Sequence, residues 1–250
     1  MTPRLHLIVP CFDEEHRLPL PDVKASLDRL SDLALTFVDD GSHDRTADVL
    51  EGLVRERPGR VGLVRLEKNV GKAEAVRAGI LPAFSEGSAY VGYWDADLAA
   101  PFESAFDLVD DLERRPGLLL AMGSRLRTRE NRIERRAFRH YPGRVVAKAI
   151  SRTLGLPVYD TQCGAKVFRV TEATRAVFEE PFETRWLFDV EILARLIRLH
   201  RQGLVAPPEE TVFEHPLPYW HDVPGSKVRA REFFRSFFAL RRIRRRYGCP

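Results

Sequence analysis

The stretches FVDDG at residues 37–41 and YWDAD at residues 93–97 are the most informative part of the sequence, because each closes an apolar run with carboxylates. An apolar run that ends in acids and a turn residue is typical of a buried strand in a parallel sheet. In open α/β sheets, ligands bind at the edge where such strands end. The two stretches therefore predict a parallel sheet whose carboxyl edge carries four aspartates.

The first hundred residues alternate regularly around these stretches. Strand patterns lie at 5–9, 33–39, 61–66 and 89–94, and helical patterns lie near 21–31, 44–57 and 72–84. Short links between alternating strands and helices predict right-handed βαβ units. We therefore expect an α/β fold with a Rossmann-like, mostly parallel twisted sheet flanked by helices.

The second part of the chain has a looser pattern. We expect a helix at 102–115, a strand at 118–123, an arginine-rich loop at 125–144, a helix at 144–154, a strand at 164–169 and a helix at 187–202. The predicted organisation is a single domain at 1–225 with two halves, 1–100 and 101–225. A basic amphipathic helix at 226–250 follows it.

The composition excludes several classes of protein. The 250 residues are 44% hydrophobic and 30% charged, which is typical of a globular chain. The three cysteines lie far apart, so we expect neither a disulfide framework nor a zinc site. A strand pattern begins at Leu5, which leaves no room for a signal peptide, and no apolar stretch approaches the ~20 residues of a membrane span. We expect a cytoplasmic protein, peripheral at the inner face of the membrane.

Asp95 and Asp97 are the strongest candidates for chemistry. Two carboxylates one residue apart repel each other unless something compensates, and carboxylates are ligands that Mg²⁺ and Mn²⁺ prefer. A cation held there leaves positions for two phosphate oxygens and neutralises charge on a departing diphosphate. We therefore predict that Asp95 and Asp97 are metal ligands, and we count Asp97 among the catalytic residues.

Other residues at the strand ends suit a nucleoside. Pro10 removes a backbone donor and is expected to stop the strand pairing, so that the backbone turns and Asp13 and Glu14 lie at the sheet edge. Asp39 and Asp40 hold the same place after the next strand, where they can accept hydrogen bonds from a ribose diol and a base. The alternatives are an ordinary acidic turn after the first strand, and a capping turn that uses one of the two aspartates.

The helical pattern at 72–84 begins with Lys72. Free N–H groups at the start of a helix, together with a lysine, can bind phosphate. The segment is not a Walker motif, because the upstream glycine and the following Ser or Thr are missing. An ordinary surface lysine is the alternative.

Together these motifs resemble a known family. VP at 9–10, Glu14, VDDGS at 38–42, NVGK at 69–72 and DAD at 95–97 resemble the nucleotide-binding half of the family 2 inverting glycosyltransferases, which have the GT-A fold. GSR at 123–125, DTQCGAKVF at 160–168, RWLFDVE at 185–191 and GSK at 225–227 resemble dolichyl-phosphate glucosyltransferases and their polyprenyl-phosphate relatives. The resemblance covers nearly the whole chain.

The resemblance implies a role for each motif. It implies nucleoside contacts for Asp13, Glu14 and Asp40, a phosphate contact for Lys72, and metal and diphosphate contacts for Asp95 and Asp97. It also implies that Arg125 lies near the acceptor phosphate. Ala99 departs from the pattern, because some phosphomannosyl relatives carry a metal-binding glutamine at this position. GDP-mannose is therefore disfavoured as the donor.

A phosphate acceptor explains the arginines of residues 125–139. A lipid phosphate is ionised at neutral pH, so its transfer needs cations and positioning rather than a general base. We expect Arg125, Arg139 and Lys166 at this phosphate, with Arg125 in a catalytic role. A solvated, arginine-biased surface is the alternative for the segment.

Two acids on the helix predicted at 187–202 have two alternative roles, one catalytic and one structural. Asp189 is a catalytic candidate, because a base on this helix would serve an acceptor that must lose a proton. The alternative is structural: Asp189 and Glu191 form ion pairs with Arg185 or Lys166.

The tail is strongly basic. Eight arginines lie between Arg229 and Arg246, and Glu232 is the acid among them. At helical spacing, the apolar residues Phe233, Phe234, Phe237, Phe238, Leu240 and Ile243 form a broad face among these arginines. This composition suits peripheral contact of 229–246 with anionic lipid. The alternative is a terminal helix that packs its phenylalanines on the domain and leaves its arginines in water.

The leading hypothesis is a metal-dependent inverting glycosyltransferase that moves a hexose, glucose from UDP-glucose, to a polyprenyl or dolichyl phosphate. The enzyme alternative is a soluble glycosyltransferase that acts on a hydroxyl of a small molecule or glycan. A third hypothesis is a non-catalytic membrane- or nucleic-acid-binding protein, although no recognised nucleic-acid motif is present. A homodimer is compatible with the sequence.

Overall fold

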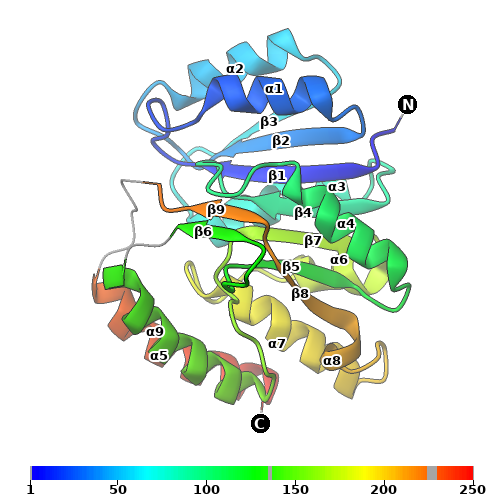
Figure 1. Cartoon of the computed structure of the whole chain (residues 1–250), viewed down its shortest axis with the longest axis vertical. Helices are drawn as coiled ribbons and strands as arrows, with labels where there is room; N and C mark the ends of the chain where they lie inside the picture. The colour runs from blue at the N-terminus through cyan, green and yellow to red at the C-terminus, as the bar shows by residue number, and fades with distance from the viewer. Residues whose placement is uncertain (1, 135–136, 224–229, 250) are drawn as a thin grey trace.

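The computed structural model describes the backbone of residues 2–134, 137–223 and 230–249, and their side chains except those of 137–145 and 230–237. Within these residues, seven strands form one sheet in the order β3-β2-β1-β4-β7-β5-β8 (Figure 1). They are β1 (Leu5–Cys11), β2 (Leu33–Asp39), β3 (Val61–Arg65), β4 (Tyr90–Trp94), β5 (Leu120–Ser124), β7 (Ala165–Arg169) and β8 (Val212–Pro216). A small parallel pair joins β6 (Arg132–Glu134) to β9 (Tyr219–His221).

The strand directions create a binding edge. β1 to β4 are mutually parallel, whereas β7 runs antiparallel to both β4 and β5. β4 and β5 therefore end at the same edge, and strands from both halves of the chain share one sheet. The chain moves outward from β1 to β3 and returns to the other side of β1 with β4. The point between β1 and β4 is thus the topological switch point, where α/β sheets bind ligands.

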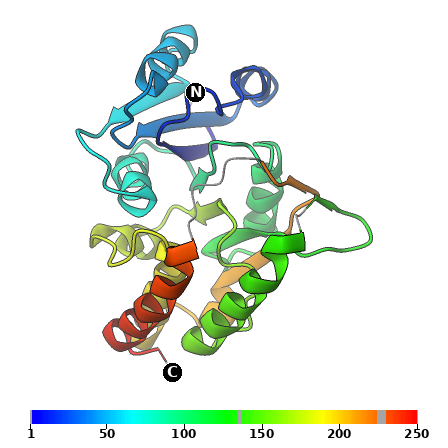
Figure 2. The same ribbon diagram turned by 90° about the vertical axis from the view of Figure 1, so that its left-hand side faces the viewer.

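Helices cover both faces of the sheet. α1 (Leu20–Arg29), α2 (Thr46–Glu56) and α4 (Ser104–Arg114) contribute to one apolar core. α3 (Lys72–Ala83), α5 (Ala137–Leu154), α6 (Glu172–Glu179), α7 (Phe188–Arg201) and α9 (Ala230–Tyr247) contribute to the other, and the short α8 (Pro208–Thr211) precedes β8. α4 shows why such segments are helical: Ala105, Leu108, Val109 and Leu112 recur at the spacing of one helix face and are fully buried. α5 and α9 lie side by side at the end of the molecule opposite α1 and α2 (Figures 1 and 2).

The predicted elements of the first hundred residues are confirmed, and so is the mostly parallel, helix-flanked sheet. The prediction of a loop at 125–144 is wrong in part, because it contains β6 and the first turns of α5. The sequence interpretation also missed α6, α8, β8 and β9. Of the predicted tail helix, the structure describes α9, while 226–229 and residue 250 lie outside the described residues.

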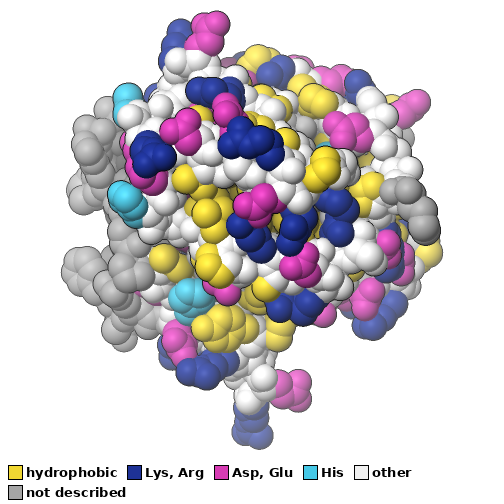
Figure 3. All heavy atoms as spheres, turned by 90° about the horizontal axis from the view of Figure 1, so that it is seen from above, with side chains coloured by type: hydrophobic (Ala, Val, Ile, Leu, Met, Phe, Trp, Pro, Cys, Tyr) yellow, Lys and Arg dark blue, Asp and Glu magenta, His cyan; other side chains and the backbone are white. Residues whose placement is uncertain are grey.

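The described surface carries both signs of charge. On the side of α1 and α2, basic and acidic side chains alternate (Figure 3). Lys24 pairs with Glu56 at 2.7 Å and Arg57 with Asp28 at 2.8 Å, which ties these two helices together. None of the helices in the described part of the chain is both long and apolar enough to cross a membrane.

Candidate active site

Asp95 and Asp97 follow β4 at the switch point, as predicted from the sequence. The Asp95 N–H donates to the carbonyl of Gly164 (2.9 Å), and the Ala99 N–H donates to Asp97 Oδ1 (3.2 Å). A Cβ on Gly164 would lie 2.0 Å from Asp95 Oδ2, so glycine is required for the carboxylate to lie where it does. The Asp95 and Asp97 side chains are 42% and 25% exposed, so a ligand can reach both.

Each of these carboxylates has a basic neighbour. Lys72 Nζ lies 2.5 Å from Asp95 Oδ1, and Arg17 Nη2 lies 3.5 Å from Asp97 Oδ2. Burial lowers the pKa of Lys72, but the carboxylates of Asp95 and Asp189 outweigh it, so the pKa is raised and the ammonium stays charged. Arg17 was not among the predicted site residues, because its contact with Asp97 spans 80 positions of the chain.

The two aspartates suit a hard divalent cation. Burial raises the pKa of Asp97 and the charge of Asp95 raises it further, which outweighs the Ala99 N–H and the cations of Arg17 and Lys72. At Asp97, burial and the repulsion from Asp95 thus outweigh the basic neighbours, and a bound cation would relieve that repulsion. Among the described residues, no cluster of three or more His, Cys, Asp or Glu could hold a metal. Two carboxylates that share a cation with phosphate oxygens are a usual arrangement for Mg²⁺.

Asp39 and Asp40 shape the turn after β2. Asp39 Oδ1 accepts from the N–H of Ser42 (3.1 Å), whereas Asp40 accepts from the N–H groups of Val70 (2.7 Å) and Gly71 (2.8 Å). Burial raises the pKa of Asp40, although these two N–H groups partly offset it. Asp40 thus fixes the loop that leads to Lys72. The predicted nucleoside contacts of both aspartates remain a prediction.

The predicted residues after β1 lie at the same edge. β1 runs to Cys11, two residues beyond the expected end. Its pairing with β4 ends at Ile8, but its pairing with β2 continues through Pro10 to Cys11. Asp13 has a left-handed backbone (φ 49°), and its Oδ1 accepts from the N–H of His43 (2.8 Å). Glu14 Oε1 accepts from Arg17 Nη1 (3.0 Å), which places Arg17 between Glu14 and Asp97.

The segment 160–164 connects the two aspartates to Arg125. Gly164, at one end, accepts from the Asp95 N–H. Asp160, at the other end, binds the guanidinium of Arg125 through two contacts of 2.6 and 2.7 Å. Burial lowers the pKa of Arg125, but Asp160 outweighs it, so Arg125 is always charged. Glu214 of β8 fixes this end of the segment, because its two oxygens accept the N–H groups of 159 and 160 at 2.7 Å.

Lys166 does not reach this surface. It is fully buried, and its ammonium donates to the carbonyls of Thr161 (2.9 Å) and Cys163 (2.7 Å) and to Asp189 Oδ1 (2.6 Å). An ammonium has three donors, so all three are used. The prediction of Lys166 at the acceptor phosphate is corrected accordingly: it holds Asp189, which also accepts from the Tyr93 hydroxyl.

The structural alternative for the two acids of α7 holds in altered form. Asp189 pairs with Lys166, as that alternative stated, but Glu191 pairs with Arg195 at 2.9 Å and not with Arg185. The side chain of Arg139 lies outside the described residues, so its predicted contact with the acceptor remains a prediction.

Comparison with known proteins places this geometry in context. The family model "Glycosyl transferase family 2" matches residues 6–173. Dolichyl-phosphate beta-glucosyltransferase of Dictyostelium discoideum is 32% identical over 238 residues, which is 90% of this chain and 68% of the relative. The enzyme of the same name from Homo sapiens is 32% identical over 247 residues, which is 88% of this chain and 71% of the relative.

A solved structure supports the fold assignment. Glucosyl-3-phosphoglycerate synthase from Mycobacterium tuberculosis, in complex with Mn²⁺, UDP-glucose and phosphoglyceric acid, superposes with a TM-score of 0.66. The alignment covers 99% of this chain and 81% of that one, at 17% identity. The shared architecture is therefore the GT-A fold.

Proposed function

Because the chain belongs to glycosyl transferase family 2, and is thus a glycosyltransferase, we propose that it transfers glucose from UDP-glucose to a polyprenyl phosphate. We infer that the transfer inverts the anomeric centre and depends on Mg²⁺ or Mn²⁺. The names of the similar enzymes from Dictyostelium discoideum and Homo sapiens support the acceptor class and the sugar. The geometry of this chain's own residues supports the roles that follow.

One observation carries the proposal: the paired aspartates and a fixed arginine face the same edge of the sheet. β4 and β5 end at that edge with β7 between them, so Asp95 and Arg125 follow strands about 10 Å apart, two strand spacings. Asp160 holds Arg125 in place. The guanidinium of Arg125 also lies 5.3 Å from the ring centroid of Trp220. Donor diphosphate on one side and acceptor phosphate on the other would bring both reactants together.

Each residue has a role in this scheme. Asp95 and Asp97 would hold the cation, which when bound neutralises the charge of the departing diphosphate. Lys72 carries a second positive charge beside Asp95 and can contact the same diphosphate. Asp13, Glu14, Asp39 and Asp40 would bind the nucleoside at the ends of β1 and β2. Arg125 would orient the acceptor phosphate, because Asp160 uses only part of its fork of donors.

A phosphate acceptor also fits the state of Asp189. Its Oδ1 is engaged by Lys166 and Tyr93, so it is held as a buried structural ion. A hydroxyl acceptor would need a positioned base, whereas a phosphate is already ionised at neutral pH. Binding and orientation then suffice, with inversion by a single displacement.

Labelled donor tests the acceptor class. The protein is incubated with radiolabelled UDP-glucose, Mn²⁺ and either a polyprenyl phosphate or the matched polyprenol without phosphate. We expect label in the lipid fraction only when polyprenyl phosphate is supplied, because Arg125 would recognise an anionic acceptor. Label on the polyprenol, or on a soluble hydroxyl acceptor instead of the lipid, would contradict the proposal.

The peripheral membrane contact is assigned to α9. The inner side of α9 packs on the domain, since Leu240 and Ile243 are buried, whereas Phe238 is 68% exposed. A groove of about 360 Å³ between α5 and α9 is lined by Ala149, Thr153, Phe238, Leu240, Arg241 and Arg244. Exposed aromatic and arginine side chains together suit the headgroups and upper chains of anionic lipid. The side chains of Phe233, Phe234 and Phe237 lie outside the described residues.

Vesicle binding tests this contact. Replacing Arg241 and Arg244 with glutamine is expected to lower the affinity for anionic vesicles, measured by co-sedimentation, by about tenfold. Each arginine contributes about 1 kcal/mol at most to this binding. The control replaces Arg45 and Arg55, exposed arginines beside and on α2, at the opposite end of the molecule. If both double variants bind as wild type does, α9 is not the membrane contact.

A further inference from the structure

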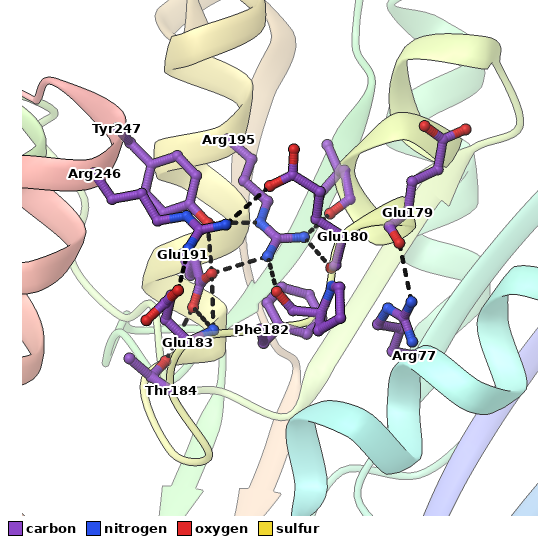
Figure 4. A network of polar contacts seen from close by, with 12 residues as sticks. Arg77, Glu179, Glu180, Phe182, Glu183, Thr184, Glu191, Arg195, Arg246 and Tyr247 are labelled. Atoms are coloured by element: carbon purple, nitrogen blue, oxygen red, sulfur yellow. Dashed lines mark hydrogen bonds and ion pairs between the residues drawn. The ribbon is translucent and has the colours of Figure 1, made fainter.

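A buried polar network joins the last turn of α9 to residues 180–187, which connect α6 to α7 (Figure 4). At its centre lies Arg195 of α7, which is fully buried. Its guanidinium donates to the carbonyls of Val177, Glu180 and Pro181 at 2.7 Å and to Glu191 at 2.9 Å. A buried charge is tolerated only with such complete pairing, so these contacts fix the segment against α7.

Tyr247 brings α9 into the network. Its hydroxyl donates to Glu191 Oε1 (2.6 Å) and accepts from Arg195 Nε (3.2 Å). Burial raises the pKa of Tyr247 to about 12, so the hydroxyl keeps its proton. Glu191 in turn accepts from the N–H of Glu183 (3.0 and 3.1 Å) and from the Thr184 hydroxyl (3.3 Å). Tyr247 therefore orients the carboxylate that holds residues 183 and 184.

Arg246 makes a second connection at the surface. Its guanidinium pairs with Glu180, at 3.2 Å, and with Glu183. The last turn of α9 thus contacts the segment 180–187 both inside the protein and at its surface.

The same segment reaches the donor site at its other end. Arg185 donates to the carbonyl (3.3 Å) and the side chain of Asn69. It also covers Gly71, where a Cβ would lie 2.5 Å from Arg185 Nε and where the backbone is left-handed (φ 98°). Gly71 is the residue whose N–H binds Asp40, and Lys72 follows it. Through Arg185, the segment 180–187 therefore contacts the loop that leads to Lys72.

We propose that Tyr247 and Arg246 are positioning residues for donor binding, and that the last turn of α9 holds residues 180–187 against the loop at 69–72. The proposal rests on the proposed function, because it assumes that a nucleoside diphosphate binds beside this loop. It also connects the helix assigned to the membrane with the donor site, two regions that the sequence interpretation treated separately.

Calorimetry with UDP and Mn²⁺ tests the role of Tyr247. The variant Tyr247→Phe is expected to bind UDP about tenfold more weakly. This is the loss expected if the arrangement of the loop at 69–72 that binds UDP falls to about a tenth of the population. The KM for the donor should rise by the same factor while kcat stays near the wild-type value, because no reacting group is changed. The control is Tyr90→Phe, another buried tyrosine whose hydroxyl contacts an arginine, at the start of β4.

Hydrogen exchange separates this proposal from the proposed function. The amides of 180–187 should exchange faster in Tyr247→Phe than in wild type, with the sheet unchanged. Arg246→Gln removes exposed pairs and leaves the core intact. We expect UDP binding to be about threefold weaker in this variant, and unchanged in the control Arg57→Gln, which lies directly after α2. Unchanged exchange, or unchanged UDP affinity in both α9 variants, overturns the positioning role. A wild-type protein that does not bind UDP overturns the proposed function instead.

Discussion

Asp97→Asn is expected to lower turnover by about a thousandfold, a loss of about 4 kcal/mol of transition-state stabilisation. The substitution keeps the shape of the side chain and its place after β4, but removes the negative charge that would hold the proposed cation. Burial and Asp95 raise the pKa of Asp97, so its ionised form opposes folding at neutral pH. The variant should therefore melt at or above the wild-type temperature. Steady-state kinetics and thermal unfolding measure the two effects.

Asp107→Asn is the matched control for this variant. Burial also raises the pKa of Asp107, but this residue lies on α4, outside the site. Its turnover should equal that of wild type. If Asp97→Asn retains turnover within a factor of ten in Mn²⁺, Asp97 is not the metal ligand that the proposed mechanism needs.

Asp189→Asn is expected to lower the free energy of unfolding by about 3 kcal/mol, because it leaves the buried Lys166 ammonium without its anion. The Lys166 side chain is 0% exposed, so water cannot replace the lost charge. Below the transition temperature, the folded variant should still transfer glucose to polyprenyl phosphate, since that acceptor is already ionised. Urea unfolding and labelled-donor assays measure stability and transfer separately.

Two comparisons isolate the ion pair. Asp28→Asn breaks an exposed pair with Arg57 and should cost less than about 1 kcal/mol. Changing Lys166 to Met together with Asp189→Asn removes both charges and should recover part of the loss. If Asp189→Asn abolishes transfer while UDP-glucose still binds, Asp189 is a general base and the argument for a phosphate acceptor fails.

The regular part of the fold could be predicted because its signals are local. β1 to β4 are apolar runs that end in acids or turns, and α1 and α2 each have a clear apolar face. The arginine-rich residues 125–144 hid β6 and the start of α5, because a highly charged sequence lacks the apolar period from which strands and helices are predicted. β8 and β9 are only partly buried, so alternation of apolar and polar residues is weak there. The antiparallel direction of β7 depends on its neighbours and has no local signal.

The position of the site could be predicted from the sequence, but several of its contacts could not. Asp95 and Asp97 follow a buried strand, and that position alone places them at the ligand-binding edge. Arg17 was missed because its partner Asp97 is distant in the sequence, and Lys166 was misplaced because the burial of a lysine cannot be read from a motif. Glu214 was also missed, because it acts only by holding the backbone of 159 and 160.

The segment 160–164 gives the motif DTQCG a physical meaning. It accepts the Asp95 N–H at one end and holds Arg125 at the other, so one short segment contacts both the proposed metal ligand and the proposed acceptor residue. Burial raises the pKa of the Cys163 thiol to about 12, so this cysteine stays neutral and serves packing, with its carbonyl bound by Lys166. The motif DTQCG at 160–164 thus corresponds to a specific set of contacts with Asp95, Arg125 and Lys166.

Titration calorimetry of UDP-glucose in Mn²⁺ and in a chelator measures whether Asp95 and Asp97 bind the donor diphosphate through a divalent cation. For wild type, we expect binding at least about a hundredfold tighter in Mn²⁺ than in chelator, a difference of about 3 kcal/mol. Asp97→Asn should bind weakly and equally under both conditions. Equal wild-type affinity with and without the cation would show that the two aspartates do not bind the diphosphate through a metal.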